Sequence, residues 1–245
     1  MRIRVRGLSA VIALVGLWFA VPAFGQTDGS TFNLSVSGPD NSVVVGDGYA
    51  DPYNGTASYN GSNINPNGLI VCDDYNHNVT AGETWTATGM QASTLTSGNV
   101  DNTRFGSSIG LLGYAEVANL VTQLLSTNNQ QLQADISSAI WWITSGGTKI
   151  GSNYSFDGVS LDANAVALLK AVLGTSSSTL LSQLAKDTNL WIMTPTSGGP
   201  NSPQEMWVET PEGGAALMYL LLAALACYGA MFLRNRNRFA SGAAI

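Results

Sequence analysis

A long apolar run near the C-terminus constrains this chain more than any other feature. Gly213–Leu233 contains 21 residues and no charge. A helix rises about 1.5 Å per residue, so roughly 20 apolar residues match a hydrocarbon core about 30 Å thick. Arg234, Arg236 and Arg238 follow at once, and such a cluster is typical of the cytoplasmic side. We therefore expect a transmembrane helix at 213–233 and a cytoplasmic basic tail at 234–245; a buried helix of a soluble protein is the alternative.

The N-terminus predicts export. Three arginines open the chain, at Arg2, Arg4 and Arg6. An apolar stretch from Leu8 to Phe19 follows, and Ala23-Phe24-Gly25 offers small residues at both positions that signal peptidase reads. This pattern predicts a signal peptide over 1–25, cleaved after Gly25. A retained anchor is the alternative, and it still leaves the middle of the chain exported.

A short motif precedes the apolar run. Pro211-Glu212 stand directly before it, and Gly213 occupies the place of a second proline. Together with the helix and the arginines, this ending resembles the PEP-CTERM sorting signal of Gram-negative bacteria. The resemblance covers about the last 30 residues. It implies recognition of the tail by an exosortase and delivery to the cell surface or an exopolysaccharide matrix. Residues 209–212 are then a tether and sorting motif.

The charge of the exported part excludes one class of partner. All sixteen acidic residues lie between Asp28 and Glu212, with only four of the ten basic ones, so the formal charge there is −12. An acidic surface repels phosphate backbones, which argues against nucleic-acid binding. Cys72 is the sole cysteine of this part, so a disulfide within the domain is excluded. The length suits one domain, which we place at 26–208.

Hydrophobic periodicity predicts an α+β domain. Residues 31–110 show alternating or short apolar runs typical of strands, such as Phe32-Leu34-Val36 and Leu69–Cys72. Three Asn-Gly pairs predict turns: Asn54-Gly55, Asn60-Gly61 and Asn67-Gly68. Residues 111–186 change to a spacing of three and four, which predicts three or four helices, one of them with Asp162 as its N-cap. Strand character returns in two segments, 190–193 and 206–208. Strands, then helices, then strands favour α+β.

Two short segments resemble the Cys-Gln thioester domains of bacterial surface adhesins. Ile70-Val71-Cys72-Asp73-Asp74 presents a cysteine at a strand end, and Ala139-Ile140-Trp141 follows some 65 residues later. The resemblance covers residues 65–145 and implies a cysteine joined to the glutamine of a Thr-Gln-x-Ala-Ile-Trp motif, which traps a host amine. Ser137 stands where that glutamine belongs. Three glutamines are nearby but off register: Gln130, Gln131 and Gln133. We carry over the fold, not the reactive bond; a buried apolar Cys72 is the favoured interpretation.

A second candidate nucleophile is Ser108. Gly106–Gly110 fits the Gly-x-Ser-x-Gly elbow of hydrolases, which needs a strand before it and a helix after it. The sole histidine, His77, precedes Ser108, unlike the order in those enzymes. A chance match is the favoured interpretation.

We expect no cofactor and no metal site. His77, with Asp73 and Asp74 beside it, is too few ligands for zinc, and a polar loop is the simpler interpretation. Three acids lie close together in a Gly-containing stretch, at Asp40, Asp47 and Asp51. They lack EF-hand spacing, so turn acids are favoured over a calcium site.

The leading hypothesis is a non-enzymatic surface or matrix protein that adheres to an exopolysaccharide or another surface ligand. The protein is either held by one membrane pass or processed by an exosortase. The alternatives are a covalent adhesin that uses Cys72 and a membrane-anchored serine hydrolase that uses Ser108.

Overall fold

The computed structural model describes residues 27–199, 202–210, 224–225 and 227–228. The predicted signal peptide, the motif Pro211–Gly213 and the three C-terminal arginines lie outside the described residues. So does most of the predicted membrane helix, of which Ala224, Leu225, Cys227 and Tyr228 are described, in helical conformation. Gln26–Pro211 form one compact unit, and this unit is described below.

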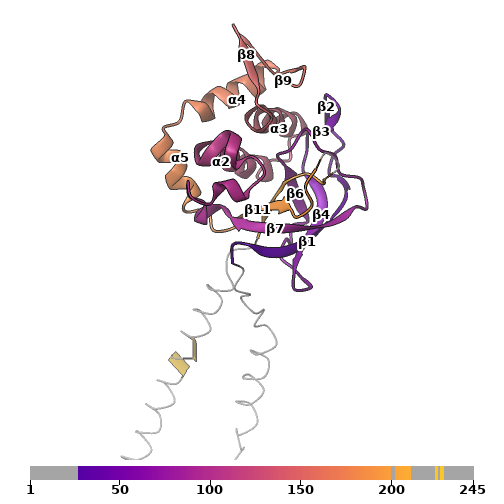
Figure 1. Ribbon diagram of the computed structural model, residues 1–245, viewed down its shortest axis with the longest axis vertical. Coiled ribbons are helices and arrows are strands. Elements are labelled where there is room, and N and C mark those ends of the chain that lie inside the picture. Colours follow the sequence, from indigo (N-terminus) through magenta and orange to yellow (C-terminus); the bar gives the residue numbers. More distant parts are fainter. Residues whose placement is uncertain (1–26, 200–201, 211–223, 226, 229–245) are drawn as a thin grey trace, which may run out of the picture. The chain divides into compact units, whose positions relative to one another are not determined.

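The main sheet of this unit is antiparallel and closes on itself. It has the strand order β1-β7-β11-β12-β6-β4-β5, and β1 pairs with β4 as well, so six strands form a ring with β5 attached to β4 (Figure 1). The bounds are β1 Ser30–Pro39, β4 Tyr53–Tyr59, β5 Ser62–Asn63, β6 Leu69–Cys72, β7 Thr84–Gln91, β11 Leu190–Pro195 and β12 Met206–Glu209. Closure removes the free edges that an open sheet would expose.

The ring has two apolar faces, and this explains the continuous apolar runs of its central strands. Successive side chains of a strand point to opposite faces. In β6, Ile70 and Cys72 join the core inside the ring, whereas Val71 joins the core under the helices. In β12, Met206 likewise joins the core inside the ring, and Trp207 joins the core under the helices. Strands buried on both faces lose the alternation of polar and apolar residues, because neither face meets water.

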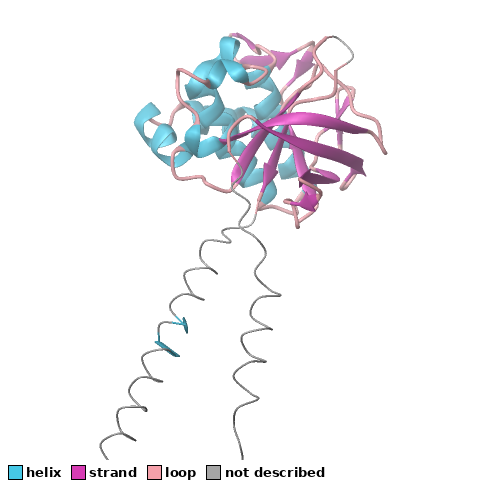
Figure 2. Cartoon of the chain, turned by 60° about the horizontal axis from the view of Figure 1, so that its bottom comes forward, coloured by secondary structure: helices cyan, strands magenta, loops and turns pink. Residues whose placement is uncertain are grey.

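Four α-helices of the described part cover one side of the ring (Figure 2). Their bounds are α2 Gly106–Leu125, α3 Gln130–Thr144, α4 Ala163–Leu173 and α5 Ser177–Leu184. The Asp162 carboxylate caps α4 by accepting from the N–H groups of Asn164 and Ala165, as predicted. Asn129 caps α3 in the same manner. The α+β prediction is confirmed at this level.

Three parts of the chain differ from the prediction. Residues 148–160, expected within the helical region, form a small sheet of β8 Thr148–Ile150, β9 Asn153–Phe156 and β10 Val159–Ser160. Its strands are two to four residues long, too short for a periodicity to show. Residues 92–105, expected to be strand, hold two 3₁₀ turns, Ala92–Thr94 and Val100–Asn102. A two-residue pair, β2 Val44–Val45 and β3 Gly48–Tyr49, lies between β1 and β4.

Two of the three Asn-Gly pairs have different roles. Asn60-Gly61 forms the expected tight turn, between β4 and β5, with φ of 49° and 79°. Asn54-Gly55 lies within β4 instead, so that turn prediction is wrong. A Cβ at Gly55 would stand 2.5 Å from the Ser35 carbonyl oxygen, and only glycine allows β1 and β4 to come so close there.

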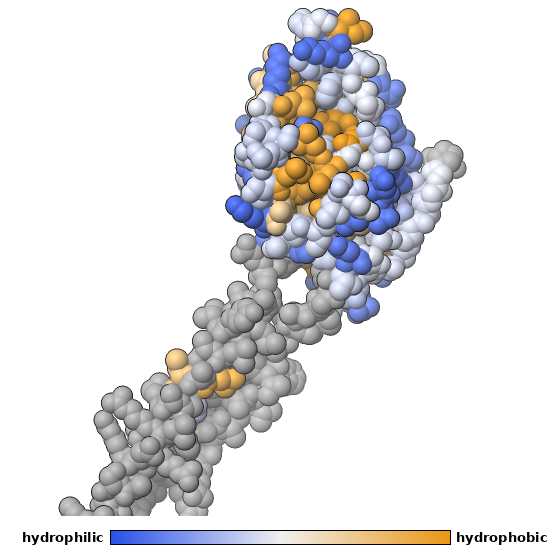
Figure 3. Space-filling model, turned by 60° about the vertical axis from the view of Figure 1, so that its left-hand side comes forward, coloured by the Kyte–Doolittle hydropathy of each residue, from blue (hydrophilic) through white to orange (hydrophobic). Residues whose placement is uncertain are grey.

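Apolar side chains also reach the surface, where they gather in one patch in the view of Figure 3. The exposed large hydrophobic residues of α2–α5 are Leu112, Leu132 and Leu173. Among the described residues, no single helix combines the length and the apolar character needed to cross a membrane. Only α4 and α5 together reach that threshold, and they meet at 90°.

Candidate functional site

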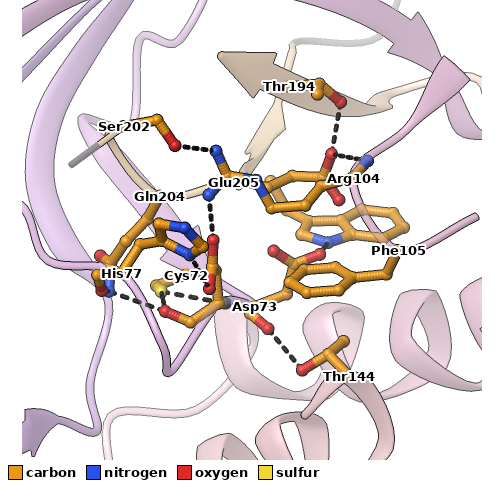
Figure 4. A network of polar contacts seen from close by, with 12 residues as sticks. Cys72, Asp73, His77, Arg104, Phe105, Thr144, Thr194, Ser202, Gln204 and Glu205 are labelled. Atoms are coloured by element: carbon orange, nitrogen blue, oxygen red, sulfur yellow. Dashed lines mark hydrogen bonds and ion pairs between the residues drawn. The ribbon is translucent and has the colours of Figure 1, made fainter. Parts of the chain in front are cut away.

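The site forms where β6 ends and β12 begins. These strands are antiparallel, and Cys72 lies opposite Met206. The pairing continues beyond the strands, since the Asp73 N–H donates to the Glu205 carbonyl at 3.5 Å. Asp74 therefore lies opposite Gln204. The loop that leads into α2 adds Arg104, and together these segments make the polar network of Figure 4.

Three carboxyl groups of this network are fully buried. Asp73, Asp74 and Glu205 are each 0% exposed. Arg104 pairs with the Asp74 carboxylate, and its backbone N–H donates to Glu205 Oε2 at 2.8 Å. Its Nη2 also donates to the Ser202 hydroxyl at 2.6 Å. Buried acids on this scale are costly unless each finds donors or keeps its proton.

Glu205 and Asp73 differ in the number of hydrogen-bond donors that their buried carboxyl groups meet. The Glu205 carboxylate accepts from the Tyr114 hydroxyl at 2.5 Å, from the Thr194 hydroxyl and from the Arg104 N–H. Asp73 Oδ2 accepts from Trp207 Nε1 at 2.6 Å, while Asp73 Oδ1 is buried without a partner. Burial, and then the nearby Glu205 charge, raise the pKa of Asp73 well above its usual value. We infer that Asp73 holds the proton and Glu205 keeps the charge.

Stability should therefore rise on mild acidification. Burial raises the pKa of all six of these carboxyls: Asp51, Asp73, Glu116, Asp135, Asp187 and Glu205. A raised folded-state pKa means that the folded state binds the proton more tightly. The free energy of unfolding then falls as pH rises from the unfolded-state pKa, about 4, to the folded-state pKa. Between these two pKa values each such carboxyl lowers it by about 1.4 kcal/mol per pH unit.

Thermal melts from about pH 4 up to neutral pH check this expectation, because raised folded-state pKa values place the loss of these protons above the unfolded-state range. The melting temperature should fall with rising pH, and Asp73→Asn should flatten the curve. Asp101→Asn, at an exposed position, should leave it unchanged. A melting temperature that climbs with pH over this interval contradicts the assignment of the proton to Asp73.

Cys72 ends β6 with its side chain inside the ring, and it is 4% exposed. The thiol donates to the Asp74 carbonyl at 3.3 Å, and its sulfur accepts from the Asp74 N–H at 3.2 Å. Burial, and then the negative charge of Asp74, raise the pKa of the Cys72 thiol well above its usual value; the Asp74 N–H and the nearby Trp141 indole oppose the rise. The predicted strand-end position and burial of Cys72 are confirmed.

Gln204 meets the same carbonyl as this thiol. Gln204 Nε2 donates to the Asp74 carbonyl at 2.8 Å and also to the His77 carbonyl. Gln204 Oε1 is buried without a partner. The Cys72 thiol and the Gln204 carboxamide therefore both donate to the same oxygen, the Asp74 carbonyl, which brings them close together. Both side chains lie in the left part of Figure 4.

Comparisons with known proteins do not identify a relative. No family model and no curated protein matches the sequence, and no solved structure matches the fold. Any assignment for this domain therefore rests on the chemistry of its own residues.

The segments that carry the thioester resemblance lie together. Thr144, the last residue of α3, donates from its hydroxyl to the Asp73 carbonyl at 2.5 Å, which ties the helix of Ala139-Ile140-Trp141 to the end of β6. Trp141 is 2% exposed, in keeping with core packing. Ser137 is also buried within α3.

Two of the three nearby glutamines are engaged elsewhere. Gln133 donates to the Thr127 carbonyl and accepts from Asn41, and Gln131 donates to Asp135. Gln130 is exposed at the start of α3. The glutamine that the structure brings to Cys72 is Gln204, which sequence reasoning missed.

A signal for Gln204 was present in the sequence. The segment 206–208 was predicted to be a strand, and 69–72 likewise. If the two had been paired antiparallel with Cys72 opposite Met206, Gln204 would have fallen on the same face as Cys72, one diagonal step away. The missing information was the register, which depends on the ring closing around its core.

Ser108 lies in the first turn of α2, and its hydroxyl donates to the Phe105 carbonyl at 2.8 Å. The 3₁₀ turn Val100–Asn102 precedes it, not the strand that a nucleophile elbow needs. Gly110 interrupts the helix with φ of 65°. His77 pairs with Asp74. The geometry therefore lends the serine hydrolase hypothesis no support.

Two of the three acids of the candidate calcium stretch, Asp40 and Asp51, accept hydrogen bonds from protein groups through their carboxylates, and Asp47 contributes a backbone contact. Asp40 accepts from the side chains of Asn41 and Asn54, Asp51 accepts from the Asn41 N–H, and the Asp47 N–H donates to the Tyr75 hydroxyl. Within the described residues, no three His, Cys, Asp or Glu side chains gather closely enough to hold a metal ion.

Proposed function

We propose that this chain is an exported surface or matrix protein that adheres to its target through a thioester between Cys72 and Gln204. The carrying observation is that the Cys72 thiol and the Gln204 carboxamide hydrogen-bond to one oxygen, the Asp74 carbonyl. Groups held in such proximity react with effective molarities of about 10⁵–10⁸ M when their orientation is right. The resemblance to thioester adhesin domains supports the same chemistry.

The two steps balance without a cofactor. The Cys72 sulfur attacks the Gln204 side-chain carbonyl carbon, a C–S bond forms, the C–N bond breaks, and the amide nitrogen leaves as ammonia with the thiol proton. A primary amine of the target then attacks the same carbon, the C–S bond breaks, and an amide links Gln204 to the target while Cys72 regains its proton. The domain is consumed by this single reaction, so it is an adhesin and not an enzyme.

The ends of the chain support export and sorting. The basic and apolar N-terminus favours a cleaved signal, and Gly213–Leu233 with its arginines favours one membrane pass. The Pro211-Glu212-Gly213 motif favours an exosortase as a processing partner. Mass spectrometry of the two termini tests this part: a product ending near Gly213 supports processing, and one that keeps Arg234–Arg238 on the membrane indicates a plain anchor.

Intact mass decides the mode of adhesion. The native exported domain should weigh less than its sequence by one ammonia, and methylamine should add to it once. Cys72→Ala should show the full sequence mass and no methylamine adduct. Gln133→Ala is the matched control, because it removes a second buried glutamine away from Cys72. Native protein at full mass and inert to methylamine rejects the thioester and leaves non-covalent adhesion.

A further inference from the structure

Among the ionisable side chains of the network, His77 meets solvent most. Its side chain is 23% exposed, against 14% for Arg104 and 0% for Asp74. Its backbone carbonyl accepts from Gln204 Nε2, so the residue lies directly against the reacting amide. The loop from Cys72 to His77 thus runs from the buried sulfur to the surface of the domain, and it carries an imidazole at its outer end.

Asp74 orients this imidazole. His77 Nδ1 lies 2.9 Å from Asp74 Oδ1, and the other carboxylate oxygen pairs with Arg104. A carboxylate that accepts from Nδ1–H leaves Nε2 as the free base, and it stabilises the imidazolium that forms when Nε2 takes a proton. The Asp74 backbone meanwhile contacts the Cys72 sulfur and the Gln204 amide. One residue therefore holds the thiol, the amide and the base together.

The reaction needs such a base. The buried Cys72 thiol gives up its proton reluctantly, because burial raises its pKa. An incoming primary amine is protonated in neutral water, and its nitrogen must lose a second proton as it forms the amide. Arg104 cannot accept a proton, and Asp73 is 0% exposed and hydrogen-bonded to Trp207 Nε1.

We propose that His77 is the proton-transfer group of the Cys72–Gln204 site, a role that rests on the thioester proposed above. His77 Nε2 takes the proton from the attacking amine nitrogen and returns one to the Cys72 sulfur as the C–S bond breaks. Formation of the thioester is the reverse of its attack by ammonia, so the same imidazole serves in both directions. A positioned base contributes about 10²–10⁴-fold to such steps.

The test compares His77→Ala with Asn78→Ala, the exposed neighbour in the same loop. Each protein is first checked for its melting temperature and intact mass, and the rate of methylamine addition is then measured with and without imidazole in the buffer. His77→Ala should form the thioester slowly or react with methylamine about 100-fold more slowly. Added imidazole should restore the rate in proportion to its concentration. Asn78→Ala should behave as the native protein does.

Two results overturn the proposal, and they are distinguishable. If native protein carries no thioester, the proposed function fails and the role of His77 fails with it. If His77→Ala forms the thioester and reacts at the native rate, or is slowed without rescue by imidazole, the thioester stands and His77 is not its base. His77→Gln, which keeps a donor to Asp74, replaces the alanine variant if that one does not fold.

Discussion

Replacing Arg104 with alanine is expected to lower the free energy of unfolding by about 3–5 kcal/mol, because it leaves a buried charge without its partner. The Asp74 carboxylate is 0% exposed, and once the guanidinium is gone it keeps only the hydrogen bond to His77 Nδ1 among the described side chains. The Ser202 hydroxyl loses its donor as well. Since a whole domain is stable by only about 5–15 kcal/mol, this change brings it close to unfolding.

Urea unfolding of single and double variants checks the cause. Arg104→Ala together with Asp74→Ala should be more stable than Arg104→Ala alone, because the second change removes the stranded charge. Lys186→Ala, at an exposed site, should change the free energy of unfolding by no more than about 0.5 kcal/mol. An Arg104→Ala variant as stable as Lys186→Ala would show that Asp74 does not depend on this pair.

Trp207 is expected to be the second most sensitive position. Its ring is 0% exposed and lies 6.0 Å from the Tyr114 ring, under the helices, and its Nε1 donates to Asp73 at 2.6 Å. Trp207→Ala should cost about 3–5 kcal/mol through the cavity it creates. Trp207→Phe keeps most of the packing but removes the donor, and it should cost about 1–3 kcal/mol.

The two Trp207 variants separate packing from hydrogen bonding, and the comparison is made by urea unfolding. In the Asp73→Ala background the remaining loss from Trp207→Phe should shrink, because the oxygen that accepts from the Trp207 Nε1–H is gone. Equal costs for Trp207→Phe in both backgrounds would contradict the pairing of Trp207 with Asp73.

Local signals predicted the elements of this fold well and their contacts poorly. Asp162 at the start of α4 and Cys72 at the end of β6 follow from capping chemistry and from short apolar runs, which depend on neighbouring residues. The closing contact between β1 and β4 depends on residues far apart in the chain, so Asn54-Gly55 was mistaken for a turn. The short strands β8–β10 carry too few residues for any period.

The candidate site was half predictable for the same reason. Cys72 and Trp141 could be recognised from their own neighbours in the sequence. Gln204 and Arg104 could not, because Gln204 is brought to Cys72 by the β6–β12 register and Arg104 is brought to Asp74 by the loop before α2. The glutamines just before the Ala139-Ile140-Trp141 motif, Gln131 and Gln133 on α3, hydrogen-bond to other partners.

Peptide mapping tests the central claim most directly. Native exported protein, digested and read by tandem mass spectrometry without exposure to amines, should yield one cross-linked product that joins the Cys72 peptide to the Gln204 peptide with the loss of one ammonia. After methylamine treatment, the label should sit on Gln204 and nowhere else. Separate peptides, with a free Cys72 and an unmodified Gln204 under both conditions, would contradict the account.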